Sequence, residues 1–350
     1  MMNKAAGIKP GCRSLSGGKS VNLFASPAPR WEGSVFDRRT LLRTEGTVYV
    51  IGAVNMDLSG TPAAALRAGD SNPGRITLSP GGVGRNIAEN LRLLGRKVSL
   101  ITITGEDTYA GLIREHCLNA GIDLQYSFTD PLGRTSAYLC INEQNGDLNV
   151  AVSDMTICDE LTPAKLEPLL PVLNHGSMVI ADANLPEDTL AWIAKNVTVP
   201  IAADPVSVSK AHRLIPLLSR LTLIKPNIPE AELLTGMTIR EDLNLSRAAD
   251  ALHRLGVRRV YISLGGRGVW ADDAREGGMM LPCAPGTIVN TTGCGDAFVA
   301  AAADAYLNGL DTMEAARRAL AASAICAEDS AAVSSRLSQE AIELKMTYPV

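Results

Sequence analysis

A run of small residues that ends in an acid is the first candidate for chemistry: Asn290-Thr291-Thr292-Gly293-Cys294-Gly295-Asp296. The alanine-rich stretch 297–307 that follows it predicts a helix. Small residues before a helix expose backbone N–H groups in front of the positive end of the helix dipole, which favours phosphate oxygens. Phosphoryl transfer to an alcohol requires an acid beside such an anion hole, and Asp296 would position and deprotonate the hydroxyl. The alternative is that Asp296 is only a helix cap or first-turn acid.

A second glycine cluster, Gly81-Gly82-Val83-Gly84-Arg85-Asn86, leads into a predicted helix over 84–94. Glycines let a ligand approach the backbone, the helix start offers free N–H groups, and Asn86 adds a donor and an acceptor. A dinucleotide fingerprint does not fit, because Ile87 stands where its third glycine or alanine belongs. A tight turn without a ligand remains the alternative.

Two polar residues, Asn55 and Asp57, come at the end of the first predicted strand. An Asp in that place, beside the first glycine cluster, can accept hydrogen bonds from two vicinal hydroxyls of a sugar. An Asx-turn that starts a flap is the alternative interpretation.

Two further motifs follow predicted strands. Lys225-Pro226-Asn227-Ile228-Pro229-Glu230 places Asn227 and Glu230 one helical turn apart. Such a pair of oxygen ligands suits magnesium, but the same pattern also forms helix caps. Ser263-Leu264-Gly265-Gly266-Arg267-Gly268 would let a nucleotide lie flat against the backbone, or would form a hairpin turn.

The scaffold for these residues is an alternation of strands and helices. From residue 47 onward, short β-branched runs alternate with helical periodicity, which predicts βαβ units around a largely parallel sheet. The expected strands are 47–53, 98–103, 178–181, 200–204, 222–225 and 259–264. The expected helices, besides 84–94 and 297–307, are 107–119, 162–173, 186–195, 229–234 and 245–255.

Three segments depart from this alternation. About 57–79 and 124–152 contain short strands and turn residues such as Asn145-Gly146, which indicates a small antiparallel flap over one edge of the α/β domain. Residues 1–46 are dominated by Ser, Gly, Pro and basic residues, and we expect a flexible N-terminal extension. Its Gly18-Lys19-Ser20 is not a P-loop, because Arg13 stands where the first glycine belongs.

Composition narrows the class of protein. The chain has 350 residues and a net charge of -4, which argues against binding to nucleic acid. Its longest apolar run, 297–303, is far shorter than the roughly 20 residues of a membrane helix. The 7 cysteines form no C-x-x-C pair, so we expect reduced thiols in a cytoplasmic protein. The 4 histidines lack metal-ligand spacing, and we expect no metal site at them.

Taken in their order along the chain, the two glycine-rich signatures, N-x-x-E and S/T-x-G-x-x-G resemble the motifs of the PfkB family of carbohydrate kinases, also called the ribokinase family. The resemblance spans about 47–342: residues 81–86 are similar to the first signature and 290–296 to the second, Asn227 and Glu230 match N-x-x-E, and Ser263, Gly265 and Gly268 match S/T-x-G-x-x-G. It implies a ribokinase-like three-layer α/β sandwich with a mainly parallel sheet flanked by helices. The kinase domain would be 47–345, with the antiparallel flap as its lid.

The resemblance also implies ATP-dependent phosphorylation. The phrases 68–74, 79–88, 152–155 and 204–207 are most similar to family members that phosphorylate the 5′-hydroxyl of pseudouridine. Asp296 would be the general base, and the amides of Gly293, Cys294 and Gly295 would form the anion hole. The residues implied in substrate binding are Asn55, Asp57, Gly81, Gly82, Asn86 and Asn184. Those implied in nucleotide binding are Asn227, Ser263, Gly265, Gly268 and Gly295, with Glu230 holding Mg²⁺ through water.

Two positions depart from the family pattern. Asn290, which with Thr292 forms a candidate K⁺ site, stands where most members have an Asp. Cys294 replaces the usual Ala or Gly, and a thiol there makes inhibition by oxidation or alkylation conceivable.

The resemblance also implies the binding partners. These are a small nucleoside and ATP, without nucleic acid or membrane, and a second copy in a homodimer formed through the flap. One alternative is a family kinase for another nucleoside or a free sugar of the ribose, adenosine or fructose type. The other is a regulator that has lost catalysis, against which Asp296 argues.

Overall fold

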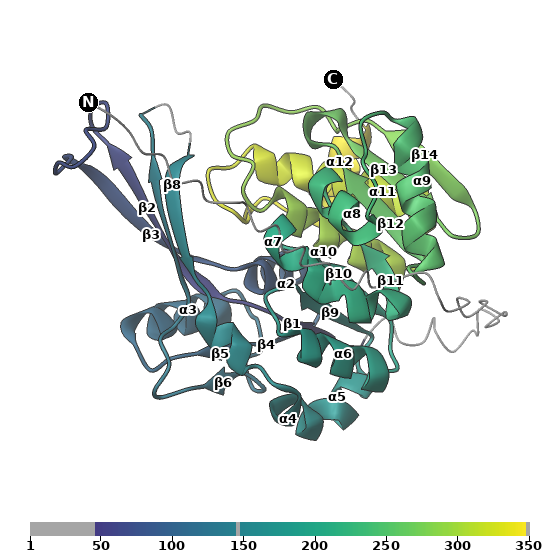
Figure 1. The fold of residues 1–350 in the computed structure, drawn as a ribbon, viewed down its shortest axis with the longest axis horizontal. Coiled ribbons are helices and arrows are strands. Elements are labelled where there is room, and N and C mark those ends of the chain that lie inside the picture. Colours follow the sequence, from purple (N-terminus) through teal and green to yellow (C-terminus); the bar gives the residue numbers. More distant parts are fainter. Residues whose placement is uncertain (1–45, 145–147, 348–350) are drawn as a thin grey trace, which may run out of the picture.

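A central sheet with the strand order β14-β13-β12-β11-β10-β9-β1-β4 organises the computed structural model, which describes residues 46–144 and 148–347 (Figure 1). Its strands are β1 (Val48–Ile51), β4 (Val98–Ile101), β9 (Met178–Asp182), β10 (Ile201–Asp204), β11 (Leu221–Ile224), β12 (Arg259–Ser263), β13 (Val269–Asp273) and β14 (Gly277–Leu281). The strands from β4 to β12 pair in parallel, whereas β13 and β14 extend the sheet antiparallel. The mainly parallel sheet predicted from the sequence is therefore confirmed.

Helices cover both faces of this sheet. Successive side chains of β1 point to opposite faces, so Val48 and Val50 enter one apolar core while Tyr49 and Ile51 enter the other. The first core lies under α2 (Val83–Leu93), α3 (Thr108–Asn119), α10 (Cys294–Leu307), α11 (Thr312–Ala327) and α12 (Gln339–Thr347). The second lies under α4 (Pro163–Leu166), α5 (Leu170–His175), α6 (Glu187–Asn196), α7 (Val208–Ala211), α8 (Ile228–Thr235) and α9 (Leu243–Arg254). This is the expected three-layer sandwich.

Some element boundaries differ from the prediction. The helix expected over 162–173 is divided into α4, the 3₁₀ turn η2 (Glu167–Leu169) and α5, because Pro168 and Pro171 cannot continue an α-helix. The strand expected over 98–103 ends at Ile101. Its last part, β5 (Ile103–Thr104), pairs with β6 (Phe128–Thr129) outside the main sheet. Three further 3₁₀ segments are η1 (Thr156–Glu160), η3 (His212–Arg220) and η4 (Gly265–Arg267).

The flap is a separate sheet that projects from one end of the sandwich (Figure 1). Its strand order is β3-β2-β7-β8, with β2 (Asn55–Pro62), β3 (Gly74–Gly81), β7 (Ala137–Asn142) and β8 (Leu148–Asp154). β2–β3 and β7–β8 are antiparallel hairpins, and the two hairpins join through a parallel pairing of β2 with β7. The sequence pattern does not predict the parallel pairing of β2 with β7, because β4, α3 and β5 lie between these two strands in the chain.

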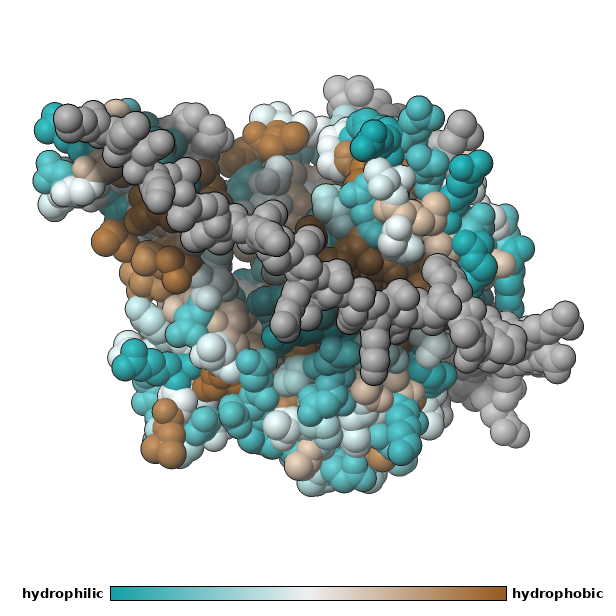
Figure 2. All heavy atoms as spheres, in the orientation of Figure 1, coloured by the Kyte–Doolittle hydropathy of each residue, from teal (hydrophilic) through white to brown (hydrophobic). Residues whose placement is uncertain are grey.

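One face of the flap carries rows of apolar side chains. Leu78, Leu58, Leu139 and Val152 lie side by side in the four strands because their positions are in register. Val152 is 63% exposed, and Ile76 in the neighbouring row is 72% exposed. Figure 2 shows hydrophobic side chains gathered over this side of the molecule. The flap therefore presents an apolar surface that the rest of the described chain does not fully cover.

Part of the sequence prediction falls outside the described residues. This applies to the N-terminal extension, apart from Gly46, and to the turn at Asn145-Gly146. Within 46–144 and 148–347, no helix is both long enough and apolar enough to cross a membrane.

Candidate active site

The predicted site residues gather where the parallel strands end. Asp57 lies in β2 just after β1, Asn184 follows β9, Asn227 follows β11, and Ser263 ends β12. The ligand-binding edge of an open parallel sheet is at the carboxyl ends of its strands, so these residues share that edge. The start of α10 brings Asp296 to the same edge, because α10 packs against both α2 and β10.

Asp296 and Asn86 join the two glycine-rich motifs. Nδ2 of Asn86 donates to Oδ2 of Asp296 over 2.7 Å, although the two residues are 210 positions apart. The Asp296 side chain lies in the first turn of α10 and the residue is 8% exposed. Burial and the nearby Asp204 together raise the pKa of Asp296 to about 8, against the opposing effects of Asn86, Lys225 and Arg85. Asp296 thus has a proton affinity suited to a base near neutral pH.

The helix α10 begins at Cys294, earlier than the 297 expected from the alanine run. Gly293 precedes it with φ 82°, and a Cβ at Gly293 would lie 1.8 Å from the carbonyl oxygen of Ala332. Only glycine fits this position, because both the backbone conformation and the close approach exclude a side chain. The amide of Cys294 also donates to the carbonyl of Thr291 over 3.3 Å, so it is the more constrained of the predicted anion-hole amides.

Lys225 lies directly over the start of α10, which the sequence did not predict. Its Nζ is 3.0 Å from the place that a Cβ on Gly295 would occupy and 3.8 Å from Oδ2 of Asp204. An ammonium group at the positive end of a helix strengthens the attraction for phosphate oxygens. In the sequence, Lys225 follows a predicted strand and stands two residues before Asn227. That position could have indicated Lys225 as a site residue.

The first glycine cluster packs tightly against the carboxyl end of β1. Gly82 has φ 101°, and a Cβ there would lie 2.5 Å from the carbonyl oxygen of Ala53. A Cβ at Gly81 would lie 2.1 Å from Oδ2 of Asp57. The Asp57 carboxylate accepts from Nδ2 of Asn55 over 2.6 Å, and burial raises its pKa. Asn55, Asp57, Gly81 and Gly82 thus form one compact group, and their role in binding a substrate stays a prediction.

Arg85 holds Asn86 in its orientation, a role that was also missed. The guanidinium donates to the side-chain oxygen of Asn86, which leaves the amide nitrogen of Asn86 to donate to Asp296. Arg85 also contacts Glu89 one turn along α2, and His116 Nε2 lies 2.9 Å from Oε2 of Glu89. This ion-pair network fixes the first turn of α2 behind the candidate base.

Asn184 is positioned by charged neighbours. Its backbone N–H donates to Oδ1 of the buried Asp182 over 2.9 Å, and Asp182 also accepts from the amide of Ala53 over 2.8 Å. Lys210 donates to the side-chain oxygen of Asn184. Asp182 therefore ties the ends of β1 and β9 together and presents Asn184 to the same edge as Asp57.

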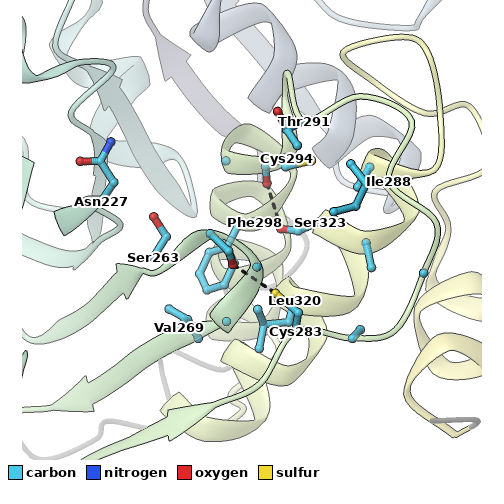
Figure 3. A pocket seen from close by; sticks show the side chains of 18 of the residues that line it. Asn227, Ser263, Val269, Cys283, Ile288, Thr291, Cys294, Phe298, Leu320 and Ser323 are labelled. Atoms are coloured by element: carbon cyan, nitrogen blue, oxygen red, sulfur yellow. Dashed lines mark hydrogen bonds between the residues drawn. The ribbon is translucent and has the colours of Figure 1, made fainter. Parts of the chain in front are cut away.

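A cavity of about 530 Å³ opens next to Gly295 (Figure 3). Asn227, Ser263, Gly265, Gly268 and Gly295, all predicted to bind nucleotide, line it. Apolar side chains form part of its wall: Val269, Ile288, Phe298 and Leu320. The run from Ser263 to Gly268 forms the turn between the antiparallel strands β12 and β13, which confirms the hairpin-turn interpretation, and the same run lines the cavity.

Asn227 and Glu230 form a capping box at the start of α8. Oδ1 of Asn227 accepts from the amide of Glu230 over 2.9 Å, and Oε2 of Glu230 accepts from the amide of Asn227 over 2.9 Å. The helix-cap interpretation is therefore confirmed. Burial raises the pKa of Glu230, and Lys225 opposes the rise. Within the described residues, no group of three or more His, Cys, Asp or Glu side chains could hold a metal ion by itself.

Asn290 and Thr292 form a local turn beside Gly293. Oδ1 of Asn290 accepts from the amide of Thr292 over 3.0 Å, and its Nδ2 donates to the carbonyl of Ser330 over 3.0 Å. The neutral side chain is already engaged at both ends. These two residues do not fit a monovalent-cation site well.

Comparison with known proteins now identifies the family. The model of the pfkB family carbohydrate kinases matches residues 46–339. The chain belongs to this family. The pseudouridine kinase of Escherichia coli (strain K12) is 34% identical over 278 residues, 79% of this chain and 88% of that protein. A solved carbohydrate kinase from Agrobacterium tumefaciens is 30% identical with a TM-score of 0.77, and the match covers 86% of this chain and 97% of that one.

The fold of this pfkB-family kinase is that of the ribokinases. Arabidopsis thaliana ribokinase, solved with ribose and ATP, has a TM-score of 0.77 at 24% identity, and the match covers 87% of this chain and 99% of that one. The chain is therefore a sugar or nucleoside kinase of the pfkB family, and the family implies ATP as co-substrate. The resemblance read from its four motifs is confirmed at this level.

Proposed function

We propose that this kinase transfers the γ-phosphoryl group of ATP to the 5′-hydroxyl of pseudouridine. The observation that supports the proposal is the 2.7 Å hydrogen bond from Asn86 to Asp296, because it joins the proposed base to the motif that would hold the ribose. The 34% identity with E. coli pseudouridine kinase supports the choice of nucleoside.

Asp296 would act as the general base. The 5′-oxygen attacks the γ-phosphorus while its proton passes to the Asp296 carboxylate, and the bond from that phosphorus to the β–γ bridging oxygen breaks to release ADP. The Asn86 amide keeps one carboxylate oxygen fixed, which leaves the other to face the hydroxyl. Lys225 and the amides at the start of α10 would stabilise the charge on the transferring group.

The group around β2 would hold the ribose. Asp57, fixed by Asn55, can accept from two vicinal hydroxyls, and the bare backbone of Gly81 and Gly82 allows the ring to approach closely. Asn184, held between Asp182 and Lys210, would contact the nucleoside from the other side. The flap would act as a lid that excludes water competing for the phosphoryl group.

The cavity beside Gly295 would take the nucleotide. Its apolar wall suits the adenine ring, and the peptide backbone of the turn from Ser263 to Gly268 would lie against the nucleotide. Glu230, a single carboxylate near the phosphate position, fits Mg²⁺ bound through water, with Asn227 beside it. When bound, the ion would neutralise charge on the β- and γ-phosphates. No step depends on a monovalent cation at Asn290 and Thr292.

The apolar face of the flap supports a homodimer. Exposed hydrophobic surfaces of this kind mark interaction sites, and in a twofold dimer this face would pack against the same face of a second copy. We further infer a kinase domain over 47–345 preceded by an N-terminal extension, and a cytoplasmic location, the last supported by the free thiols of the described cysteines.

An ADP-release assay with matched substrates tests the function. Pseudouridine, uridine, ribose and adenosine are compared at equal concentration, with product phosphorylation confirmed by mass. The proposal expects pseudouridine to give the highest kcat/KM. Uridine is the sharpest control because it carries the same ribose on a different glycosidic bond. A clear preference for ribose or adenosine would replace the substrate while keeping the kinase, and absence of ADP release with every acceptor would overturn both.

A further inference from the structure

Two cysteines meet behind the anion hole. Cys294 is the first residue of α10 and Cys326 lies in the last turn of α11. Both thiols contact the turn that precedes α10: Sγ of Cys326 donates to the carbonyl of Thr292 over 3.6 Å, and Sγ of Cys294 donates to the carbonyl of Asn290 over 3.9 Å. Cys294 lines the cavity next to Gly295 (Figure 3), whereas Cys326 is 1% exposed. One thiol is thus reachable from the cavity, and a second thiol lies directly behind it.

The surroundings make Cys294 the reactive member of the pair. The neighbouring Cys326 thiol lowers the pKa of Cys294, and the Lys225 ammonium also lowers it. The first turn of a helix also favours a thiolate. By contrast, burial raises the pKa of Cys117 to about 11 and that of Cys158 to about 12, so those thiols stay protonated and inert. Cys326 keeps its proton, because the neighbouring Cys294 raises its pKa.

We propose that Cys294 and Cys326 form a peroxide-responsive dithiol that switches the kinase off by closing into a disulfide. The Cys294 thiolate attacks one oxygen of hydrogen peroxide, the O–O bond breaks, and protonation of the departing hydroxide gives water and a Cys294 sulfenic acid. Cys326 then attacks the Cys294 sulfur, the S–S bond forms, and the sulfenic hydroxyl leaves as a second water with the Cys326 proton. Two thiols and one peroxide thus give one disulfide and two waters.

The expected effect on catalysis follows from distance. Bonded sulfurs lie about 2 Å apart, closer than two thiols that are only in contact, so closing the disulfide must draw Cys294 toward α11. The Cys294 carbonyl already accepts from Oγ of Ser323 over 2.9 Å, which ties the start of α10 to α11. A displacement of about 1 Å at a phosphate-positioning backbone costs on the order of 100-fold in rate. This loss of rate rests on the proposed function, whereas the disulfide itself does not.

The test uses the full chain, treated with hydrogen peroxide and then divided between intact-mass measurement, peptide mapping and the ADP-release assay. We expect a mass loss of about 2 Da, a mapped Cys294–Cys326 link, and a roughly 100-fold fall in kcat that dithiothreitol restores. An ATP analogue should slow the oxidation, because Cys294 lines the cavity.

Two variants separate the pair from other thiols. Cys326→Ser should keep basal activity, since a hydroxyl can donate to the carbonyls of Thr292 and Ala332 that Cys326 contacts. After peroxide it should carry a dimedone adduct at Cys294 and no disulfide. Cys140→Ser, in the flap, should behave as the parent chain. No internal disulfide in the parent chain, a link to a different cysteine such as Cys283, or a disulfide without loss of rate would each overturn the proposal. If no substrate is phosphorylated, the mass and mapping results still decide whether the dithiol closes.

Discussion

Replacing Asp296 with Asn should abolish most of the activity while leaving the site assembled. Asn has the size of Asp and can still accept from Asn86, so ATP binding should stay close to that of the parent chain. What is lost is proton transfer, which contributes about 100-fold to 10,000-fold in rate. We therefore expect kcat at pH 8 to fall at least about 100-fold, measured by coupled ADP release, with ATP affinity measured separately by calorimetry.

The raised pKa of Asp296 predicts how the rate of the parent chain depends on pH. Because the pKa of Asp296 is raised to about 8, the reactive carboxylate disappears as pH falls below that value. At pH 6 about one hundredth of the molecules keep it, so kcat/KM of the parent chain should lie about 100-fold below its alkaline plateau. The Asp296→Asn variant should lack this acid limb, and any pH dependence left in it belongs to ATP or other groups.

The same substitution should stabilise the fold at high pH. The folded-state pKa of Asp296 lies above its ordinary value of 3.8, so its contribution to stability is complete below pH 3.8 and is lost as pH rises through about 8. Asp296→Asn cannot ionise. Its melting temperature should therefore exceed that of the parent chain at pH 8, and the difference should shrink toward pH 4.

Asp304→Asn is the matched control for this set. Asp304 is buried on the same helix, about 12 Å further along its axis, where its Oδ1 accepts from Nε of Arg96 over 2.6 Å. Its loss should reduce stability without moving the acid limb. An Asp296→Asn variant that keeps more than about a third of the parent kcat would contradict the role of Asp296 as general base. A kcat/KM of the parent chain that does not change between pH 6 and 8 would contradict the same role.

Three other substitutions test separate parts of the site. Glu230→Gln preserves the capping box, since Gln serves at that position, and should raise the Mg²⁺ concentration needed for half-maximal rate; an unchanged titration would remove Glu230 from the metal site. Lys225→Met should lower kcat/KM for ATP by about 100-fold, whereas Lys210→Met should act on the KM for the nucleoside; equal effects on both substrates would contradict the two assignments. Leu139→Glu places a charge on the apolar face of the flap and should convert a dimer to a monomer by sedimentation velocity; a parent chain that is monomeric at all concentrations refutes the dimer.

The sequence predicted the parts of this site that depend on local pattern. Glycine clusters before helices and polar residues after buried strands identify Asn86, Asp57 and Asp296, because the carboxyl ends of parallel strands must share one edge. The sequence did not predict Lys225 and Arg85 as site residues, although both stand inside recognised motifs. Their roles depend on which residue faces them across the fold: Gly295 for Lys225 and the amide oxygen of Asn86 for Arg85. A linear pattern carries no information about such a meeting.

The prolines of 162–173 and the early start of α10 show the same limit at the level of elements. Apolar spacing alone indicated one helix where Pro168 and Pro171 divide it. The alanine run marked the body of α10 and not its first turn, because Cys294 and Gly295 are poor helix formers, although both are helical in the structure.

The contact between Gly293 and the carbonyl of Ala332 has a consequence for evolution and engineering. The start of α10 rests on the segment around Ala332, which lies downstream of α11, so this loop helps to fix the backbone at the proposed phosphate site. Insertions or deletions near Ala332 should therefore alter turnover while leaving melting behaviour nearly unchanged, and natural variation there becomes a route to tune the enzyme without rewriting its signature motifs.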